Sequence, residues 1–208
     1  MNRYKAIIYD IDGTLLDTVA MNMYPLKQII KEELGEDWPY EQVLRFNALP
    51  GMQTLAILGV QDIDTVYARW VRYVNAYGPG AQPYDGIPRL LEQVRDLGIT
   101  QAIVSSKQRR QYGIDMGGNG FDKFMATAVL YEDVTRHKPD PEALNECLRR
   151  LGLTEKDVLF VGDARTDLEA ARNAGVDFAY AKWGSSVFVS PEEVAHYLEH
   201  PLDLLAHL

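Results

Sequence analysis

The sequence predicts an α/β protein with a doubly wound, parallel-sheet (Rossmann-like) core and an inserted all-helical domain. Short apolar runs at 6–9, 100–104 and 158–161 have the composition of strands that are buried on both faces. Strands of this kind belong to parallel sheets that helices cover on both sides. Between the first two runs the sequence has only helical periodicity, which indicates a separate helical insertion.

The first apolar run ends in two carboxylates, Asp10 and Asp12, which are followed by the flexible Gly13. Ligands of open α/β sheets bind beyond the carboxyl ends of the strands, so this exit is a candidate active site. Two acidic groups this close repel each other unless a cation or a shared proton lies between them, and a divalent metal ion is one explanation. The alternative is a simple turn, because Asp-Gly is a common turn pair.

Residues 17–84 are predicted to form a helical cap domain, and residues 1–16 with 85–208 the α/β catalytic core. Four helical segments without a strand are too long for an ordinary crossover between parallel strands. A domain inserted after a catalytic strand can close over the site and contact the substrate. The basic candidates for this contact, each of which is more commonly a solvated side chain, are Lys27, Arg45, Arg69 and Arg72.

The α/β pattern resumes after the insertion. Expected elements are a helix at 88–97, strands at 100–104, 124–130, 158–161 and 178–181, and a helix that begins at Ser190. The segment 124–130 is also compatible with a helix. Ser105 follows the second strand, where an isolated serine ordinarily caps the next helix. Lys138 precedes a proline on a stiff loop, and a charge held in this way suits a phosphate group.

Acidic side chains recur after the strand at 158–161. Asp163 and Asp167 are four residues apart, which lets both reach one ion if the intervening loop begins a helix. Asp163 alone could cap that helix, but capping does not explain why acidic residues follow two separate strands.

Four segments taken in order resemble the four motifs of the haloacid dehalogenase-like hydrolases. They are Asp10-Ile11-Asp12-Gly13-Thr14, Ser105, Lys138-Pro139, and Gly162-Asp163 with Asp167. The helical insertion after the first strand is similar to that of the phosphoglycolate phosphatase-like branch of this family. The resemblance implies the doubly wound core with a helical cap.

The resemblance also assigns roles to the matching residues. It implies that Asp10 is the nucleophile and that Asp12 is the general acid and base. The hydroxyl of Ser105 and the ammonium of Lys138 are implied to hold the phosphoryl oxygens.

A Mg²⁺ cofactor follows from the same resemblance. Its implied ligands are Asp10, the backbone carbonyl of Asp12, Asp163 and Asp167, the last directly or through water. The cation would cancel negative charge that otherwise repels an anionic substrate.

The function that the resemblance implies is Mg²⁺-dependent hydrolysis of a small, phosphoglycolate-like phosphomonoester through an aspartyl-phosphate. Asp12 favours phosphate over halide chemistry, because dehalogenases of this family lack the second aspartate. A phosphosugar mutase and a pyrophosphatase remain alternatives on the same core, and so does a non-enzymatic module that binds metal and phosphate. The sequence does not identify the substrate.

Composition limits the partners. A formal net charge of −9 and a pI near 4.9 argue against sequence-independent nucleic-acid binding, which requires Lys and Arg to neutralise phosphates. No apolar run approaches the roughly 18 residues of a membrane span, and no signal-peptide pattern is present, so a cytoplasmic protein without membrane contact is expected.

The single cysteine, Cys147, is expected in the core. The oligomeric state is not determined, with a monomer as the default.

Overall fold

The computed structural model describes residues 3–47, 49, 51–184 and 189–208. The chain divides into two compact units. The core unit comprises Met1–Asp17 and Pro83–Leu208, and the helical unit comprises Thr18–Gln82.

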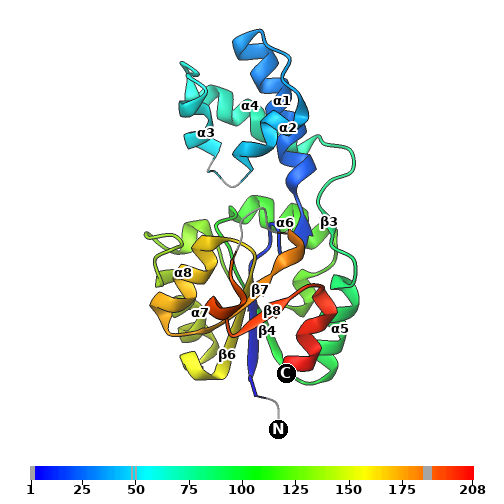
Figure 1. Ribbon diagram of the computed structural model, residues 1–208, viewed down its shortest axis with the longest axis vertical. Helices are drawn as coiled ribbons and strands as arrows, with labels where there is room; N and C mark the ends of the chain where they lie inside the picture. The colour runs from blue at the N-terminus through cyan, green and yellow to red at the C-terminus, as the bar shows by residue number, and fades with distance from the viewer. Residues whose placement is uncertain (1–2, 48, 50, 185–188) are drawn as a thin grey trace. The chain divides into compact units, whose positions relative to one another are not determined.

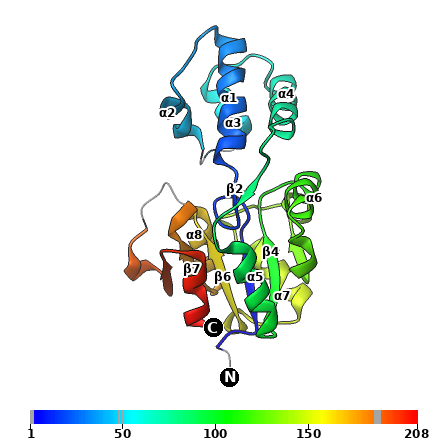
Figure 2. The same ribbon diagram turned by 90° about the vertical axis from the view of Figure 1, so that its right-hand side faces the viewer.

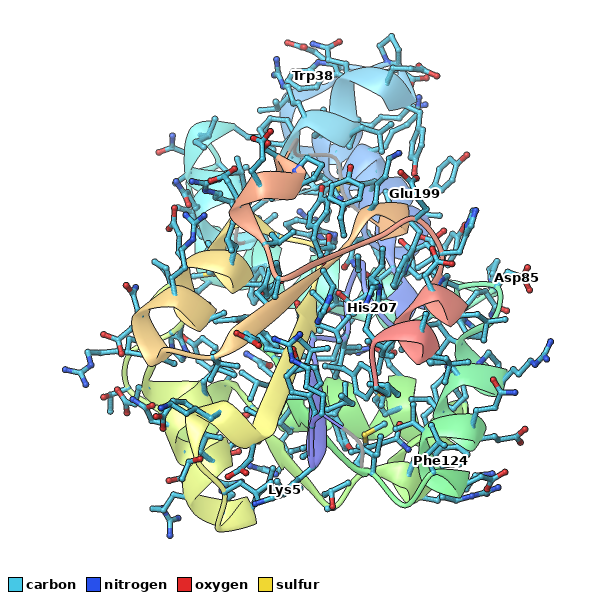
Figure 3. The ribbon with its side chains drawn as sticks, turned by 60° about the horizontal axis from the view of Figure 1, so that its bottom comes forward. Lys5, Trp38, Asp85, Phe124, Glu199 and His207 are labelled. Carbon is cyan, nitrogen blue, oxygen red and sulfur yellow. The ribbon has the colours of Figure 1, made fainter. Side chains whose placement is uncertain are left out.

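The core unit is built on a six-stranded sheet with the strand order β5-β4-β1-β6-β7-β8. The strands are β1 (Ala6–Tyr9), β4 (Thr100–Val104), β5 (Thr127–Val129), β6 (Val158–Gly162), β7 (Asp177–Ala181) and β8 (His196–Leu198). All five neighbouring pairs are parallel, which confirms the predicted sheet. All strands therefore end at the same edge of the sheet. In Figure 3 the label of Lys5, which directly precedes β1, marks the edge at which the strands begin. The label of Glu199, which directly follows β8, marks the edge at which they end.

Helices cover both faces of this sheet. They are α5 (Ile87–Asp96), α6 (Arg109–Gly118), α7 (Glu142–Leu151) and α8 (Arg165–Ala174). Figure 1 shows α7 and α8 on one side of the sheet, and α5 with the C-terminal 3₁₀ helix (Pro201–His207) on the other. Figure 2 shows α5 from the front. Every residue of β1 is buried, as expected for a strand covered on both faces.

An apolar cluster of the core unit lies between the sheet and the helices α7 and α8. Ile8 and Phe160 contribute to it from the sheet, and Leu144 and Cys147 from α7. Cys147 has no exposed surface, and burial raises the pKa of its thiol to about 12. The cysteine is therefore an inert packing residue, in agreement with the core position expected from the sequence.

The helical unit contains α1 (Val19–Leu34), α2 (Tyr40–Val43), α3 (Gly51–Ile57) and α4 (Ile63–Asn75). It has an apolar core of its own, in which Leu26 and Ile30 of α1 are joined by Leu55 of α3 and Trp70 of α4. The segments that connect the two units, β2 (Leu16–Asp17) and β3 (Gln82–Pro83), pair in a separate two-stranded sheet.

The C-terminal part of the chain differs from the prediction. The helix expected at Ser190 is a single turn, Pro191–Glu193, and β8 follows it three residues later. The Glu193 carboxylate accepts a hydrogen bond from the Ser190 amide, so the sequence signal for a helix start is satisfied locally. Pairing with β7 then continues the chain as an edge strand instead of a helix.

The strand expected at 124–130 is also shorter than predicted. Only Thr127–Val129 pairs with β4, and Asp122–Phe124 forms a 3₁₀ turn. None of the helices in the described ranges combines the length and apolar character that crossing a bilayer requires.

Replacing Ile8 by Ala is expected to lower the free energy of unfolding by about 2–4 kcal/mol, because the side chain is fully buried in β1 and its removal leaves a cavity. Urea unfolding measures the change. Ile114→Ala is the matched control, since this isoleucine of α6 is 45% exposed and its truncation should change stability by less than about 0.5 kcal/mol. Equal losses in the two variants would contradict the assigned core.

Candidate active site

Three neighbouring strand ends form the candidate site. Tyr9, the last residue of β1, lies opposite Ile103 of β4 and Val161 of β6. Asp10 directly follows β1, and its amide donates to the Val161 carbonyl at 2.9 Å. Because β1 is flanked by β4 and β6, the residues that leave these three strands meet at one edge of the sheet.

An acidic cluster lies at this edge. Asp10, Asp163 and Asp167 each place one carboxylate oxygen so that the three oxygens lie within 4.8 Å of one another. Asp167 has no exposed surface, and Asp10 is only 7% exposed. Oδ1 of Asp10 is buried and accepts no hydrogen bond in the described part of the chain, as expected of an oxygen atom that serves as a metal ligand. Clustered carboxylate oxygens are also the donors that Mg²⁺ and Ca²⁺ prefer, so these residues fit a divalent metal ion.

Lys138 compensates part of this negative charge. Its Nζ lies 2.6 Å from Oδ1 of Asp167 and 3.1 Å from Oδ2 of Asp10, and its side chain is only 6% exposed. Burial acts to lower the pKa of Lys138, but the two carboxylates outweigh it and raise the pKa, so the ammonium remains charged. One positive charge beside three carboxylates leaves the cluster with a net negative charge when all three are ionised.

This excess of negative charge affects the pKa values of the carboxyl groups. Burial is the main cause that raises the pKa of Asp10 to about 6; Asp167 and Asp12 add to it, and Lys138 opposes it. Burial, followed by the charges of Asp167 and Asp10, also raises the pKa of Asp163 well above its ordinary value. A bound cation would reverse this balance, because it favours the ionised forms.

The turn after β1 is packed tightly against Asp163. Gly13 has φ +77°, and a Cβ at this position would overlap the Asp163 carboxylate. Thr14 Oγ1 donates to Oδ1 of Asp163 at 3.2 Å, and the Thr14 carbonyl accepts from the Trp183 indole at 2.9 Å. Gly184 packs so closely on the Gly13 carbonyl that a side chain there would also overlap it. The role of Trp183 and Gly184, which follow β7, was not predicted from the sequence.

The other two predicted catalytic residues lie at the same edge without joining the acidic cluster directly. Ser105 follows β4 and is 7% exposed, and within the described residues its Oγ accepts a hydrogen bond from the Lys107 amide at 3.3 Å. The Asp12 side chain is 42% exposed and forms an ion pair with Lys107, whose Nζ lies 2.9 Å from Oδ1 of Asp12.

Lys107 is a further residue of this site that the sequence analysis did not single out. Its side chain is only 7% exposed, and its Nζ also lies 2.6 Å from Oδ2 of Asp115 on α6. Burial acts to lower the pKa of Lys107, but Asp12 and Asp115 outweigh it and raise the pKa. Its position two residues beyond Ser105 was a possible signal, but the partner on α6 was not visible in the sequence.

Comparison with known proteins identifies the class. A sequence profile described as haloacid dehalogenase-like hydrolase matches residues 7–181, so the chain belongs to this family. The match confirms the family that the four motifs indicated, and it spans both the core unit and the helical unit.

Individual relatives are named for phosphate chemistry. An N-acetylmuramic acid 6-phosphate phosphatase from Pseudomonas aeruginosa is 31% identical, over 98% of this chain and 94% of that protein. The pyrophosphatase PpaX from Oceanobacillus iheyensis is 27% identical, over 86% of this chain and 84% of its own. A crystal structure of a candidate phosphoglycolate phosphatase from Lactobacillus plantarum has a TM-score of 0.85 at 27% identity and covers 100% of both chains.

Asp163→Asn is expected to stabilise the metal-free protein near pH 8, on the order of 1 kcal/mol, because it removes one of the crowded negative charges. The sign follows from the raised pKa of Asp163. The Asp163 carboxyl binds its proton more tightly in the folded state than in the unfolded chain. The loss of folding stability caused by ionising Asp163 is therefore absent below about pH 4 and develops as the pH rises. Thermal unfolding in EDTA at pH 4 and pH 8 measures the effect. A variant that is less stable than wild type at pH 8 would contradict the assigned charge crowding.

Proposed function

We propose that the protein is a Mg²⁺-dependent phosphatase that hydrolyses a small phosphorylated metabolite through an aspartyl-phosphate. The observation that carries this proposal is the buried Asp10, which shares one cluster with two further carboxylates and the ammonium of Lys138. The names of the relatives support phosphate as the group that is removed.

In the proposed reaction Asp10 attacks phosphorus while the leaving oxygen departs in line. Asp12 gives its proton to that oxygen and then, as a base, takes a proton from the water that hydrolyses the aspartyl-phosphate. Ser105 and Lys138 bind the non-bridging oxygens of the phosphoryl group. Lys138 is already desolvated and charged, so it can stabilise the added negative charge without reorganisation.

The proposed ligands of Mg²⁺ are Asp10, the backbone carbonyl of Asp12, Asp163 and Asp167. When bound, the cation supplies positive charge that draws the phosphate dianion toward a site that is otherwise acidic.

The helical unit is proposed to act as a cap domain that selects the substrate. Two of its four basic candidates are engaged by carboxylates of the same unit. Lys27 lies 2.8 Å from Asp37, and Arg69 pairs with Glu32 and Glu33. Arg45 instead stacks over the Trp38 ring. We therefore propose that side chains other than Lys27 and Arg69 contact the leaving group of the substrate.

Pyrophosphate hydrolysis is the second candidate, and several similar proteins bear the name pyrophosphatase PpaX. A comparison of purified protein on N-acetylmuramic acid 6-phosphate, phosphoglycolate and inorganic pyrophosphate separates the two substrate classes. A mutase would instead interconvert phosphosugars and require a bisphosphate primer.

Asp10→Asn is expected to reduce hydrolysis of p-nitrophenyl phosphate with Mg²⁺ by about 10³-fold or more, since an amide cannot form the aspartyl-phosphate. Release of p-nitrophenol measures the rate. The circular dichroism spectrum and melting temperature establish that the variant is folded. Activity that survives the substitution removes Asp10 from the role of nucleophile, and a wild type without turnover favours the non-enzymatic module.

Affinity for Mg²⁺ is expected to fall below pH 6, because protons compete with the cation for Asp10, whose metal-free pKa is about 6, and for Asp163. The loss should approach roughly tenfold per pH unit for each proton that binding displaces. Titration calorimetry at pH 5.5 and 7.5 measures it. Asp163→Asn should bind the cation more weakly at both values, whereas equal wild-type affinities at the two pH values would speak against these ligands.

A further inference from the structure

Lys107 is a buried charge to which the proposed reaction gives no part. Its ammonium lies between two carboxylates of the core unit, 2.9 Å from Oδ1 of Asp12 and 2.6 Å from Oδ2 of Asp115. Oδ1 of Asp12 is buried and, among the described residues, accepts no hydrogen bond of ordinary geometry. The contact with Lys107 is thus an ion pair, and it is the interaction that holds this oxygen.

Asp115 fixes the position of the lysine. It is 3% exposed on α6, and its second carboxylate oxygen accepts a hydrogen bond from Gln111 Nε2 at 2.8 Å. Both oxygens of Asp115 are therefore engaged, one by Gln111 and one by Lys107. A buried carboxylate with fixed partners gives the lysine one preferred position.

The backbone of Lys107 is held as well. Its amide donates to Ser105 Oγ at 3.3 Å, and its carbonyl accepts from the Tyr131 amide at 3.1 Å. The lysine is thereby anchored at both ends, whereas the Asp12 side chain that it contacts is 42% exposed. Of the two partners, Lys107 is the one that can hold the other.

We propose that Lys107, anchored by Asp115, is a positioning residue that aims the Asp12 carboxylate for proton transfer. This inference rests on the proposed function, in which Asp12 protonates the leaving oxygen and later takes a proton from water. Lys107 keeps its protons throughout. A group that transfers a proton must lie within hydrogen-bond reach of its target, and an exposed aspartate without a fixed partner samples several rotamers.

The test compares two phosphomonoesters whose leaving groups differ in their need for a proton. p-Nitrophenolate leaves without general acid help, whereas an alkoxide requires it. Lys107→Met should reduce kcat/KM for an alkyl phosphate such as glycerol phosphate by about 10–100-fold, with a much smaller loss for p-nitrophenyl phosphate. Asp115→Asn, which keeps the shape of the side chain, should produce the same pattern at smaller amplitude. Lys156→Met, at an exposed lysine before β6, is the control and should change neither rate.

A double substitution tests whether Lys107 affects the rate through Asp12. If Lys107 acts through Asp12, then Lys107→Met should cause no further loss in the Asp12→Asn background. Lys107→Arg should retain part of the alkyl phosphate activity, because it keeps a positive charge at this position.

Three results would overturn the inference. They are equal losses for both esters, an undiminished loss in the Asp12→Asn background, and a raised KM with unchanged kcat, which would make Lys107 a substrate-binding residue. If Lys107→Met does not fold, Asp115→Asn decides by the same comparison. Asp10→Asn separates this inference from the function itself. An active Asp10→Asn enzyme contradicts the proposed function, whereas an inactive one beside a fully active Lys107→Met enzyme contradicts the positioning role alone.

Discussion

Repulsion among three crowded carboxylates is the constraint around which the core unit is built. Two charges about 5 Å apart repel by roughly 3–4 kcal/mol at an effective dielectric constant near 20. Asp10, Asp163 and Asp167 lie close enough inside the protein to repel one another in this way when ionised. The ammonium of Lys138 offsets only part of this repulsion. Such an arrangement costs stability in the folded chain, and a cation bound between the carboxylates would relieve the repulsion.

The parallel sheet supplies the rigidity that this arrangement needs. β1 is fully buried and hydrogen-bonded on both sides, so Asp10 leaves it from a position that its neighbours fix. The turn that follows is equally restricted, because Gly13 lies where a side chain would displace Asp163. The Asp-Gly pair is thus a turn, as its composition suggested, and it is also part of the site.

Much of the fold and the positions of the site residues could be predicted because they depend on local patterns. Buried strands such as Val158–Gly162 are continuous apolar runs, and polar residues at their ends are visible in the sequence. The edge strand β8 was not predictable in this way. Its residues, His196–Leu198, form no apolar run, and only pairing with β7 makes them a strand.

The contacts around Asp12 were beyond prediction for a related reason. Lys107 follows β4 and Asp115 lies eight residues further on, in α6, and neither residue type shows in the sequence that the two side chains pair. Trp183 is a similar case, since its indole reaches the Thr14 carbonyl across 169 positions of the chain. Polar pairs such as these depend on tertiary packing rather than on residue type.

The burial of Cys147 has a practical consequence for spectroscopy. The chain has one cysteine, and its thiol projects from α7 into the apolar cluster, where burial raises its pKa to about 12, so we expect thiol reagents to leave the native protein unmodified. A cysteine introduced on an exposed helix would therefore take up a fluorophore or spin label at that point alone. The natural sequence can thus serve directly as the background for single-site labelling of either unit during turnover.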